Sequence, residues 1–388
     1  MRKKKQSSDN VKVRLGGSLI FLSIAALLAI LLLILRALAF NNSKIADFYT
    51  GKIFTPLATA FTWLTSLLPF SLTEFSLILG LPFLLGLLVY GLIRLIKNKS
   101  HRGIRFLRIS SIVAAVALTL LSLFIAFHGI NYARSPLADV MNLEVKERSV
   151  DELEAAMRIL GQAAASVREG LPEDDSGRII TGTTGDLQKS AHLGWEIAGN
   201  RWPALDSSVR SKPKGVLLSK YWSYTKIVGM YMPLLVEANI NIDQPDFMIP
   251  ATTAHELAHT RGFAREDETD FAGLLSCFVH PDPIWQYSGL ISAWKDLSRK
   301  LAAEDRERWS QAYTDTVTEA IARDLESEYI YWEAYETPVA EVSTQINDAY
   351  LKANRETEGV KSYGGVVDLL LAWLETDDAD QPLSSILP

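Results

Sequence analysis

Residues 250–275 read Pro250-Ala-Thr-Thr-Ala-His-Glu-Leu-Ala-His-Thr-Arg-Gly-Phe-Ala-Arg-Glu-Asp-Glu-Thr-Asp-Phe-Ala-Gly-Leu-Leu275 and contain the pattern His-Glu-x-x-His. Residues four positions apart on a helix lie one above the other, so His255 and His259 can present their imidazoles to one metal ion. Glu256 lies beside them. This spacing is typical of zinc hydrolases, in which neutral nitrogen ligands hold Zn²⁺, an open position takes water, and a carboxylate accepts the proton of that water. An ordinary amphipathic helix with unrelated histidines is the alternative.

Acidic residues follow the two histidines closely and offer a third ligand. Gly262 can end the helix in a left-handed turn and return the chain toward the metal. A catalytic zinc usually has three protein ligands, and a carboxylate suits the third position. Glu266 and Glu268 are the candidates, and Asp270 follows them, although such carboxylates are also typical of a solvated helix N-terminus.

The segment Glu266-Asp-Glu-Thr-Asp270 resembles the Glu-x-x-Ala-Asp element that supplies the third ligand in several membrane-associated His-Glu-x-x-His peptidases, with Thr269 in place of alanine. The resemblance implies that Glu266 is the ligand. It also implies that Asp270 orients a ligand histidine through a hydrogen bond. Glu268 is the competing ligand.

Three apolar runs are each long enough to cross a bilayer as a helix: residues 15–40, 75–96 and 109–130. The N-terminus and residues 94–108 are basic, so both are predicted to be cytoplasmic. Three spans then place the rest of the chain outside. We therefore predict a multi-pass protein of the cytoplasmic membrane, with residues 1–130 as the membrane region and residues 131–388 as an extracytoplasmic domain.

The connection between the first two runs, residues 41–73, has a mixed character. It contains several aromatic residues and two prolines, and its apolar part is too short to span. Trp and Tyr favour the headgroup level of a membrane. An interfacial or re-entrant helix is therefore expected here.

Charge is divided unevenly between the two regions. Residues 1–130 hold 15 Lys+Arg and 3 Asp+Glu, whereas residues 131–388 hold 24 and 42, a formal charge of −18. A nucleic-acid partner is not expected, because phosphate binding needs a basic surface. The expected partners are the lipid bilayer and an extracytoplasmic peptide or protein substrate. The single cysteine, Cys277, lies among apolar residues, so it is expected to be buried and no intramolecular disulfide can form.

Most of the outer domain has helical periodicity. Residues 236–242 alternate apolar and polar side chains, which predicts a half-buried strand just ahead of the metal helix. In many zinc peptidases a strand in this position borders the cleft and pairs with an extended substrate, although a plain sheet strand is an equal alternative. Asn239 on this strand is therefore a candidate substrate contact. The predicted fold is mainly α: three transmembrane helices followed by a mostly helical, zincin-like α+β domain with a small sheet.

Two tyrosines and a histidine outside the central block also have side chains that suit a binding site. Tyr350 and Tyr363 lie in polar, glycine-containing segments that could form a cleft wall, with a hydroxyl donating to an oxyanion; core packing with a satisfied hydroxyl is the commoner role of tyrosine. His280 stands beside two prolines at a helix end, so it is expected on the surface.

Several segments together resemble an uncharacterised bacterial membrane family, domain-of-unknown-function family 3810. They are the three spans, Asn131-Tyr-Ala-Arg-Ser-Pro-Leu137, Glu237-Ala-Asn-Ile-Asn241, the block from His255 to Asp270, Tyr350-Leu-Lys-Ala-Asn354 and Ser362-Tyr-Gly364. Family members mostly have Glu-Asp-Glu-Ala-Asn-Phe where this chain has Glu-Asp-Glu-Thr-Asp-Phe. Both ligand candidates are kept, and the residues at Thr269 and Asp270 differ. The family has no settled activity, so the resemblance supports the architecture rather than the chemistry.

These observations predict a membrane-anchored zinc metallopeptidase that cleaves extracytoplasmic peptides or envelope proteins, with Glu256 as general base. A non-catalytic envelope interaction or assembly protein with a structural or vestigial zinc site is the alternative, and hydrolysis of a non-peptide amide stays open. An intramembrane protease fits less well, because His255 lies far beyond the last span in the sequence. A closed site with four protein ligands would favour the non-catalytic protein. An open position beside a free strand edge would favour the enzyme.

Overall fold

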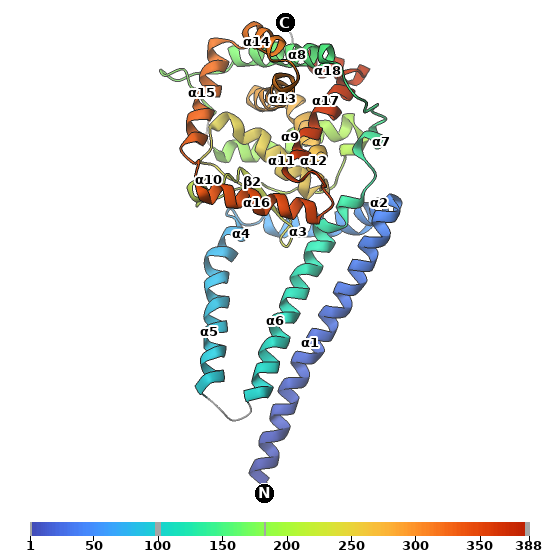
Figure 1. The fold of residues 1–388 in the computed structure, drawn as a ribbon, viewed down its shortest axis with the longest axis vertical. Coiled ribbons are helices and arrows are strands. Elements are labelled where there is room, and N and C mark those ends of the chain that lie inside the picture. The colour runs from blue at the N-terminus through green and yellow to red at the C-terminus, as the bar shows by residue number, and fades with distance from the viewer. Residues whose placement is uncertain (1, 98–101, 182–183, 385–388) are drawn as a thin grey trace.

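The computed structural model describes residues 2–97, 102–181 and 184–384, and three long helices extend from one end of a mostly helical domain (Figure 1). The elements of these helices are α1 (Arg2–Asn41), α4 (Leu72–Phe75), η2 (Ser76–Gly80), α5 (Leu81–Lys97), α6 (Arg102–Phe124), η3 (Ile125–Gly129) and η4 (Asn131–Ala133). Three stretches are long and apolar enough to cross a membrane: Gly16–Asn41, Leu72–Lys97 and Arg102–Ala133. The three predicted spans are therefore confirmed, and the chain is a membrane protein.

Short helices connect the first and second spans: α2 (Ser43–Tyr49), the π-helical turn η1 (Thr50–Phe54) and α3 (Thr55–Thr65). They lie across the ends of the spans, directly beneath the domain (Figure 1). Phe48 and Trp63 are exposed by 65% and 67%. This placement agrees with the interfacial helix predicted for residues 41–73.

The domain consists mainly of helices. They are α7 (Leu137–Met141), α8 (Val150–Glu169), α9 (Thr184–Arg201), α10 (Ser219–Ser223), α11 (Ile249–Thr260), α12 (Glu266–Phe278), α13 (Pro283–Glu304), α14 (Arg306–Thr316), α15 (Glu319–Glu333), α16 (Pro338–Ala353), α17 (Val366–Leu374) and α18 (Asp377–Ser384), with the 3₁₀ turns η5 (Pro203–Leu205), η6 (Asp246–Met248) and η7 (Gly359–Gly365). Buried side chains of α12 and α13 such as Phe271, Leu275, Trp285 and Leu290 belong to the main core. Helix α11, which carries His255 and His259, packs against both of these helices.

A three-stranded sheet lies ahead of α11 in the chain, with the order β1-β3-β2. β3 (Glu237–Ile240) pairs in parallel with β1 (Lys214–Gly215) and antiparallel with β2 (Gly229–Met232). The predicted strand forms as β3, but it is buried along its whole length and hydrogen-bonded on both sides. The predicted half burial was therefore wrong, because a central strand covered on both faces needs no solvent side. Of the two alternatives left open, a plain sheet strand or a strand that pairs with substrate, β3 is the plain sheet strand, since both of its edges are already paired. β1 and β2 are the edge strands of this sheet.

Apolar packing is continuous between the spans and the domain. One buried cluster joins side chains from α1, the connection, the third span and the sheet region, among them Ala39, Phe54, Ile125, Ile130 and Val236. The domain boundary expected near residue 130 stays a prediction, since this cluster extends across it. The membrane helices and the domain are thus packed as one unit at their junction.

Polar contacts fasten the second span to the sheet. The buried carboxylate of Glu237 accepts hydrogen bonds from Leu72 N (3.2 Å), Thr73 N (2.9 Å) and Thr73 Oγ1 (2.7 Å). Backbone N–H groups at a helix start have no partner within the helix, and a negative charge there also interacts favourably with the helix dipole. β3 therefore caps the helix that continues into the second span.

Candidate metal centre

A left-handed turn after α11 brings the acidic segment back toward the two histidines. Gly262 has φ of +90°, a conformation that other residues rarely adopt. Its N–H donates to His259 O (3.0 Å), and Phe263 N–H donates to Ala258 O (3.3 Å), which is the hydrogen-bond pair of a Schellman helix end. The predicted role of Gly262 is confirmed. α12 then begins at once, at Glu266.

Three of the predicted ligand side chains converge. Ligand atoms of His255, His259 and Glu266 all lie within 4.8 Å of one another. Glu266 Oε2 is 3.3 Å from His255 Nε2 and 3.6 Å from His259 Nε2. These two histidines and one carboxylate could hold a metal ion.

Glu268, the competing ligand, has other partners. Its Oε1 accepts a hydrogen bond from Leu137 N (2.6 Å) and another from the Arg265 guanidinium. Both bonds hold the carboxylate against the segment that follows the third span. The structure therefore places Glu266, and not Glu268, beside the two histidines.

The second ring nitrogen of each histidine is also bonded. His255 Nδ1 lies 2.6 Å from Asp270 Oδ1, and His259 Nδ1 lies 2.8 Å from the backbone carbonyl of Phe263. Since both partners are acceptors, each Nδ1 donates the proton of its hydrogen bond, and Nε2 is the ring atom that could bind a metal. The partner proposed for Asp270 from the sequence is thus observed.

Glu256 is a residue of α11, and its side chain lies against the edge strand β2. Its side chain is 5% exposed, and its Oε2 has no hydrogen-bond partner. A Cβ placed on Gly229 of β2 would come within 2.5 Å of Glu256 Oε1. Glycine at this position therefore provides the space that the carboxylate occupies.

The carboxyl groups of the site could balance the charge of a bound cation. Burial raises the pKa of Glu256. Burial acts in the same direction on Glu266, but the neighbouring His259 and His255 outweigh it and lower the pKa of that carboxyl. Glu266 Oε2 is also buried without a hydrogen-bond partner. A divalent ion between the imidazoles and Glu266 would satisfy this oxygen and offset the negative charge gathered here.

The three candidate substrate contacts lie in different places. The ring of Tyr363 in η7 stacks on His255 at a centroid distance of 6.5 Å, so it adjoins the site. Tyr350 packs against Phe124 of the third span at 6.0 Å. Asn239 is fully buried beside the start of the second span. Its amide oxygen accepts a hydrogen bond from Ser71 Oγ (2.6 Å), and its amide nitrogen donates one to Thr73 Oγ1 (3.1 Å). The prediction for Asn239 is corrected, because no part of its side chain is left for a substrate.

His128, near the end of the third span that meets the domain, was missed by the sequence analysis. Its ring lies edge-to-face on His259, 5.5 Å between centroids, and also contacts Tyr231 of β2 at 5.3 Å. It is 4% exposed, and its Nδ1 has no hydrogen-bond partner. An ionisable residue inside an apolar span is a signal that could have drawn attention to it. The metal site thus adjoins the membrane helices although it is distant from them in sequence.

His280 is buried rather than on the surface, which corrects its predicted position. Its Nε2 lies 3.0 Å from Ser190 O, and its Nδ1 accepts from Asp282 N at 3.0 Å. Two backbone partners satisfy the ring, so it can be buried without a metal. Cys277 is buried as predicted.

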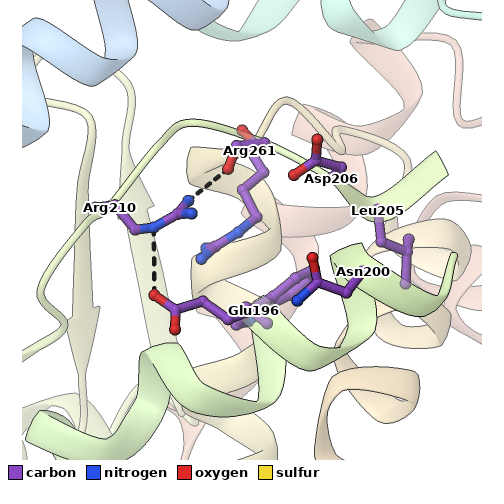
Figure 2. Close-up of a pocket in the computed structure, with 8 residues that line it drawn as sticks. Glu196, Asn200, Leu205, Asp206, Arg210 and Arg261 are labelled. Carbon is purple, nitrogen blue, oxygen red and sulfur yellow. Dashed lines mark hydrogen bonds and ion pairs between the residues drawn. The ribbon is translucent and has the colours of Figure 1, made fainter. Parts of the chain in front are cut away.

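A separate pocket of about 210 Å³ lies beside the end of α11 (Figure 2). Arg261, which follows α11, is buried there with its guanidinium 4.3 Å from the ring of Trp195. Arg210 Nε pairs with Glu196 Oε1 at 3.6 Å. No ligand candidate lines this pocket, so it is distinct from the metal centre.

The fold and the site define a membrane protein with three candidate spans and a largely helical domain that holds a possible site for a metal ion. The family model described as "Protein of unknown function (DUF3810)" matches residues 49–371, and the chain belongs to this family. The resemblance noted in the sequence is therefore confirmed. No curated protein and no solved structure matches the chain.

Proposed function

We propose that this protein is a membrane-anchored zinc-dependent hydrolase of the metallopeptidase type, with a zincin-like arrangement of helix, edge strand and ligands. The observation that carries the proposal is the convergence of His255, His259 and Glu266, with the unpartnered carboxylate of Glu256 beside them. Two imidazoles and one carboxylate are a ligand set typical of catalytic zinc. Within the part of the chain that the structure describes, no fourth His, Cys, Asp or Glu joins this group, which leaves a position for water.

Each residue has a defined task in this proposal. Zinc would act as a Lewis acid that activates water and polarises the scissile carbonyl. Glu256 accepts the proton of the attacking water and returns it to the leaving amine. Asp270 and the carbonyl of Phe263 hold the imidazoles of His255 and His259 in the tautomer that leaves Nε2 free. Tyr363, whose ring stacks on His255, would donate its hydroxyl to the oxyanion.

Strand β2 offers a binding edge for an extended peptide. It pairs with β3 on one side, and no other strand in the described residues pairs with its second edge. Main-chain hydrogen bonds to such an edge bind a peptide largely independently of its sequence. Gly229 would bring this edge close to Glu256. A peptide or envelope protein is therefore the proposed substrate class.

The proposed location of the domain is outside the cytoplasmic membrane. The basic N-terminus and the basic segment between the second and third spans favour a cytoplasmic position for both. Three spans then leave the domain on the opposite side. The substrates proposed are accordingly extracytoplasmic.

A non-catalytic assembly protein with a structural zinc site is the second candidate. His259 and Glu266 are only 6% and 5% exposed, and Tyr363 covers His255. Structural zinc sites are closed in this way, although they usually have four protein ligands. The three-residue ligand group favours the enzyme.

The deciding experiment compares the wild type with Glu256→Gln, which does not alter the proposed ligands. Both purified full-length proteins are expected to contain about one zinc ion each. Cleavage of a peptide library is expected to fall by about 100-fold or more in the variant, since general acid–base catalysis contributes about 10²–10⁴-fold. The exposed carboxylate of Glu326, far along the chain, gives the matched control Glu326→Gln, which should cleave like the wild type. Stoichiometric zinc with no cleavage that depends on Glu256 would favour the structural role.

A further inference from the structure

Helix α16 exposes an apolar stripe. Val339, Val342 and Ile346 are exposed by 55%, 54% and 65%. Their spacing of three and four residues places them along one side of the helix. Glu341 and Gln345 occupy a different side. An apolar stripe of this kind on a domain surface indicates a surface that something else covers.

Contacts elsewhere on α16 show which way the stripe faces. Tyr350 lies one turn after Ile346, and its ring packs on Phe124 of the third span. Just after the helix, Asn354 Oδ1 accepts a hydrogen bond from Arg36 of the first span at 3.1 Å. The stripe therefore continues the side of α16 that meets the membrane helices.

The opposite side of α16 meets the domain's own backbone. Asp348 Oδ1 accepts a hydrogen bond from Val360 N in η7 at 3.1 Å, and its other oxygen binds Lys352 at 2.7 Å. On a helix, position 348 is separated from position 346 by about 200°, so these polar groups point away from the stripe. One side of α16 is therefore apolar and continues toward the membrane helices, and the other side is polar and bonded to η7.

Other exposed apolar side chains lie at the same end of the domain. Figure 1 shows α3, α10 and α16 at the end from which the three spans leave. Trp63 and Leu64 on α3 and Tyr221 on α10 are exposed by 67%, 59% and 67%. Aromatic residues at this level are typical of proteins that contact lipid headgroups.

We propose that α16 is an interfacial helix whose stripe of Val339, Val342 and Ile346 inserts into the lipid surface around the ends of the spans. Lipid is the occupant that continuity with the spans indicates, because α16 packs on the third span and Asn354, the residue that follows it, is hydrogen-bonded to the first span. An amphipathic helix of this kind lies in the plane of the interface with its apolar side in the lipid. No second protein is needed to cover the stripe.

This placement has a consequence for substrates that rests on the proposed function. η7 follows α16 and carries Tyr363, which stacks on His255. The metal centre is therefore held next to the membrane surface. Chain segments that lie close to the membrane, such as the outer ends of membrane-anchored proteins, are the substrate class that this position favours. The lipid contact of α16 itself depends only on the geometry and would stand if the protein had no hydrolase activity.

Spin labels on single introduced cysteines test the lipid contact in the full-length protein. The native Cys277 is fully buried and should not react. Labels are placed at Val342→Cys and Ile346→Cys, with Gln345→Cys as the polar-side control and Leu85→Cys, 59% exposed in the second span, as the lipid reference. The protein is reconstituted in vesicles of phosphatidylethanolamine and phosphatidylglycerol. Labels at 342 and 346 are expected to collide more with oxygen than with a water-soluble nickel chelate, as at 85, and the label at 345 should show the reverse.

Two results would overturn the proposal. Nickel accessibility at 342 and 346 equal to that at 345 would show that the stripe faces water. Exclusion of both reagents, with spin–spin coupling that disappears on dilution with unlabelled protein, would show that a second copy covers it. Val342, Ile346 and Leu85 are each more than half exposed and Gln345 is also exposed. The substitutions should therefore leave the thermal unfolding midpoint unchanged, which is checked for each variant.

Discussion

Both ring nitrogens of each site histidine have a defined environment. Nδ1 of His255 and of His259 is engaged by Asp270 and by the carbonyl of Phe263, and both Nε2 atoms face Glu266. Partners of this kind fix the ring orientation and raise the basicity of a metal-ligating histidine. The two rings differ in the charge of their partner. Only His255 depends on a side chain that can be substituted.

Asp270→Ala is therefore expected to lower zinc affinity by about 10–100-fold, the usual cost of losing such a partner. The ligands themselves stay in place. Zinc affinity can be measured by competition with a chelator at fixed pH. Asp139→Ala, which removes an exposed carboxylate on α7, should bind like the wild type. Equal affinity of Asp270→Ala and the wild type would show that the hydrogen bond does not support the metal site.

Two substitutions can separate the contribution of the aromatic ring of His128 from that of its nitrogen atoms. His128→Ala removes the edge-to-face contact with His259, and such pairs contribute about 0.5–1.5 kcal/mol. We expect a lower zinc affinity, by up to about tenfold. His128→Phe keeps an aromatic edge and removes the unpartnered Nδ1, so it should bind zinc nearly as well as the wild type. A phenylalanine variant as weak as the alanine variant would mean that the imidazole acts through its nitrogen atoms.

The elements of the site pack closely at two glycines, where a side chain would meet the neighbouring element. The turn after α11 can pack closely against η1 because Gly262 has no side chain. A Cβ there would lie 3.0 Å from both Phe54 and Thr50 of η1. Gly273 allows α12 to pack on α11, since a Cβ at that position would lie 3.1 Å from His255 N. The ligand geometry is thus set by packing between helices as much as by the helix that carries the two histidines.

Gly262→Ala is expected to destabilise the protein by about 1–2 kcal/mol for the left-handed conformation alone, with more from the contact with η1. The thermal midpoint in detergent should fall. Gly103→Ala provides the comparison, because a Cβ there has nothing within 4 Å. Its midpoint should stay the same or rise slightly, as glycine is unfavourable inside a helix. An unchanged midpoint for Gly262→Ala would show that the turn relaxes without cost.

In the molecule as a whole, hydrogen bonds close to the candidate metal site connect the spans to the domain. Arg134 Nη1 donates to Gly262 O (2.9 Å), and Arg265 Nη1 donates to Tyr132 O (3.0 Å) and Arg134 O (2.9 Å). These bonds connect the end of the third span with the turn between α11 and α12. A shift of that span would therefore be transmitted to the segment that carries Glu266.

The orientation of the whole chain can be tested with a membrane-impermeant thiol reagent. Ser310→Cys lies on the exposed surface of α14, and Gly103→Cys lies at the start of the third span on the opposite side of the predicted membrane. Intact cells should label position 310 at once and position 103 only after permeabilisation. The buried Cys277 gives the background. Labelling of position 103 in intact cells would reverse the proposed orientation.

The sequence alone determined the three spans and the two histidines of the candidate metal site. Apolar runs of membrane length and histidines four residues apart are local signals, because one helix is enough to give them meaning. Gly262 was predictable for the same reason, since the end of a helix depends on its own neighbours. The resemblance to the Glu-x-x-Ala-Asp element then favoured Glu266 as third ligand.

Only the tertiary structure decided which side chains meet across elements. Glu266 and Glu268 are two residues apart, and their roles differ because Leu137 and Arg265 bind one of them. Asn239 was mistaken for a substrate contact because its partners, Ser71 and Thr73, are more than 160 residues away in the chain. The place of His128 beside His259 likewise depends on the packing of a membrane helix against the domain, and long-range packing of this kind leaves no periodic pattern in the sequence.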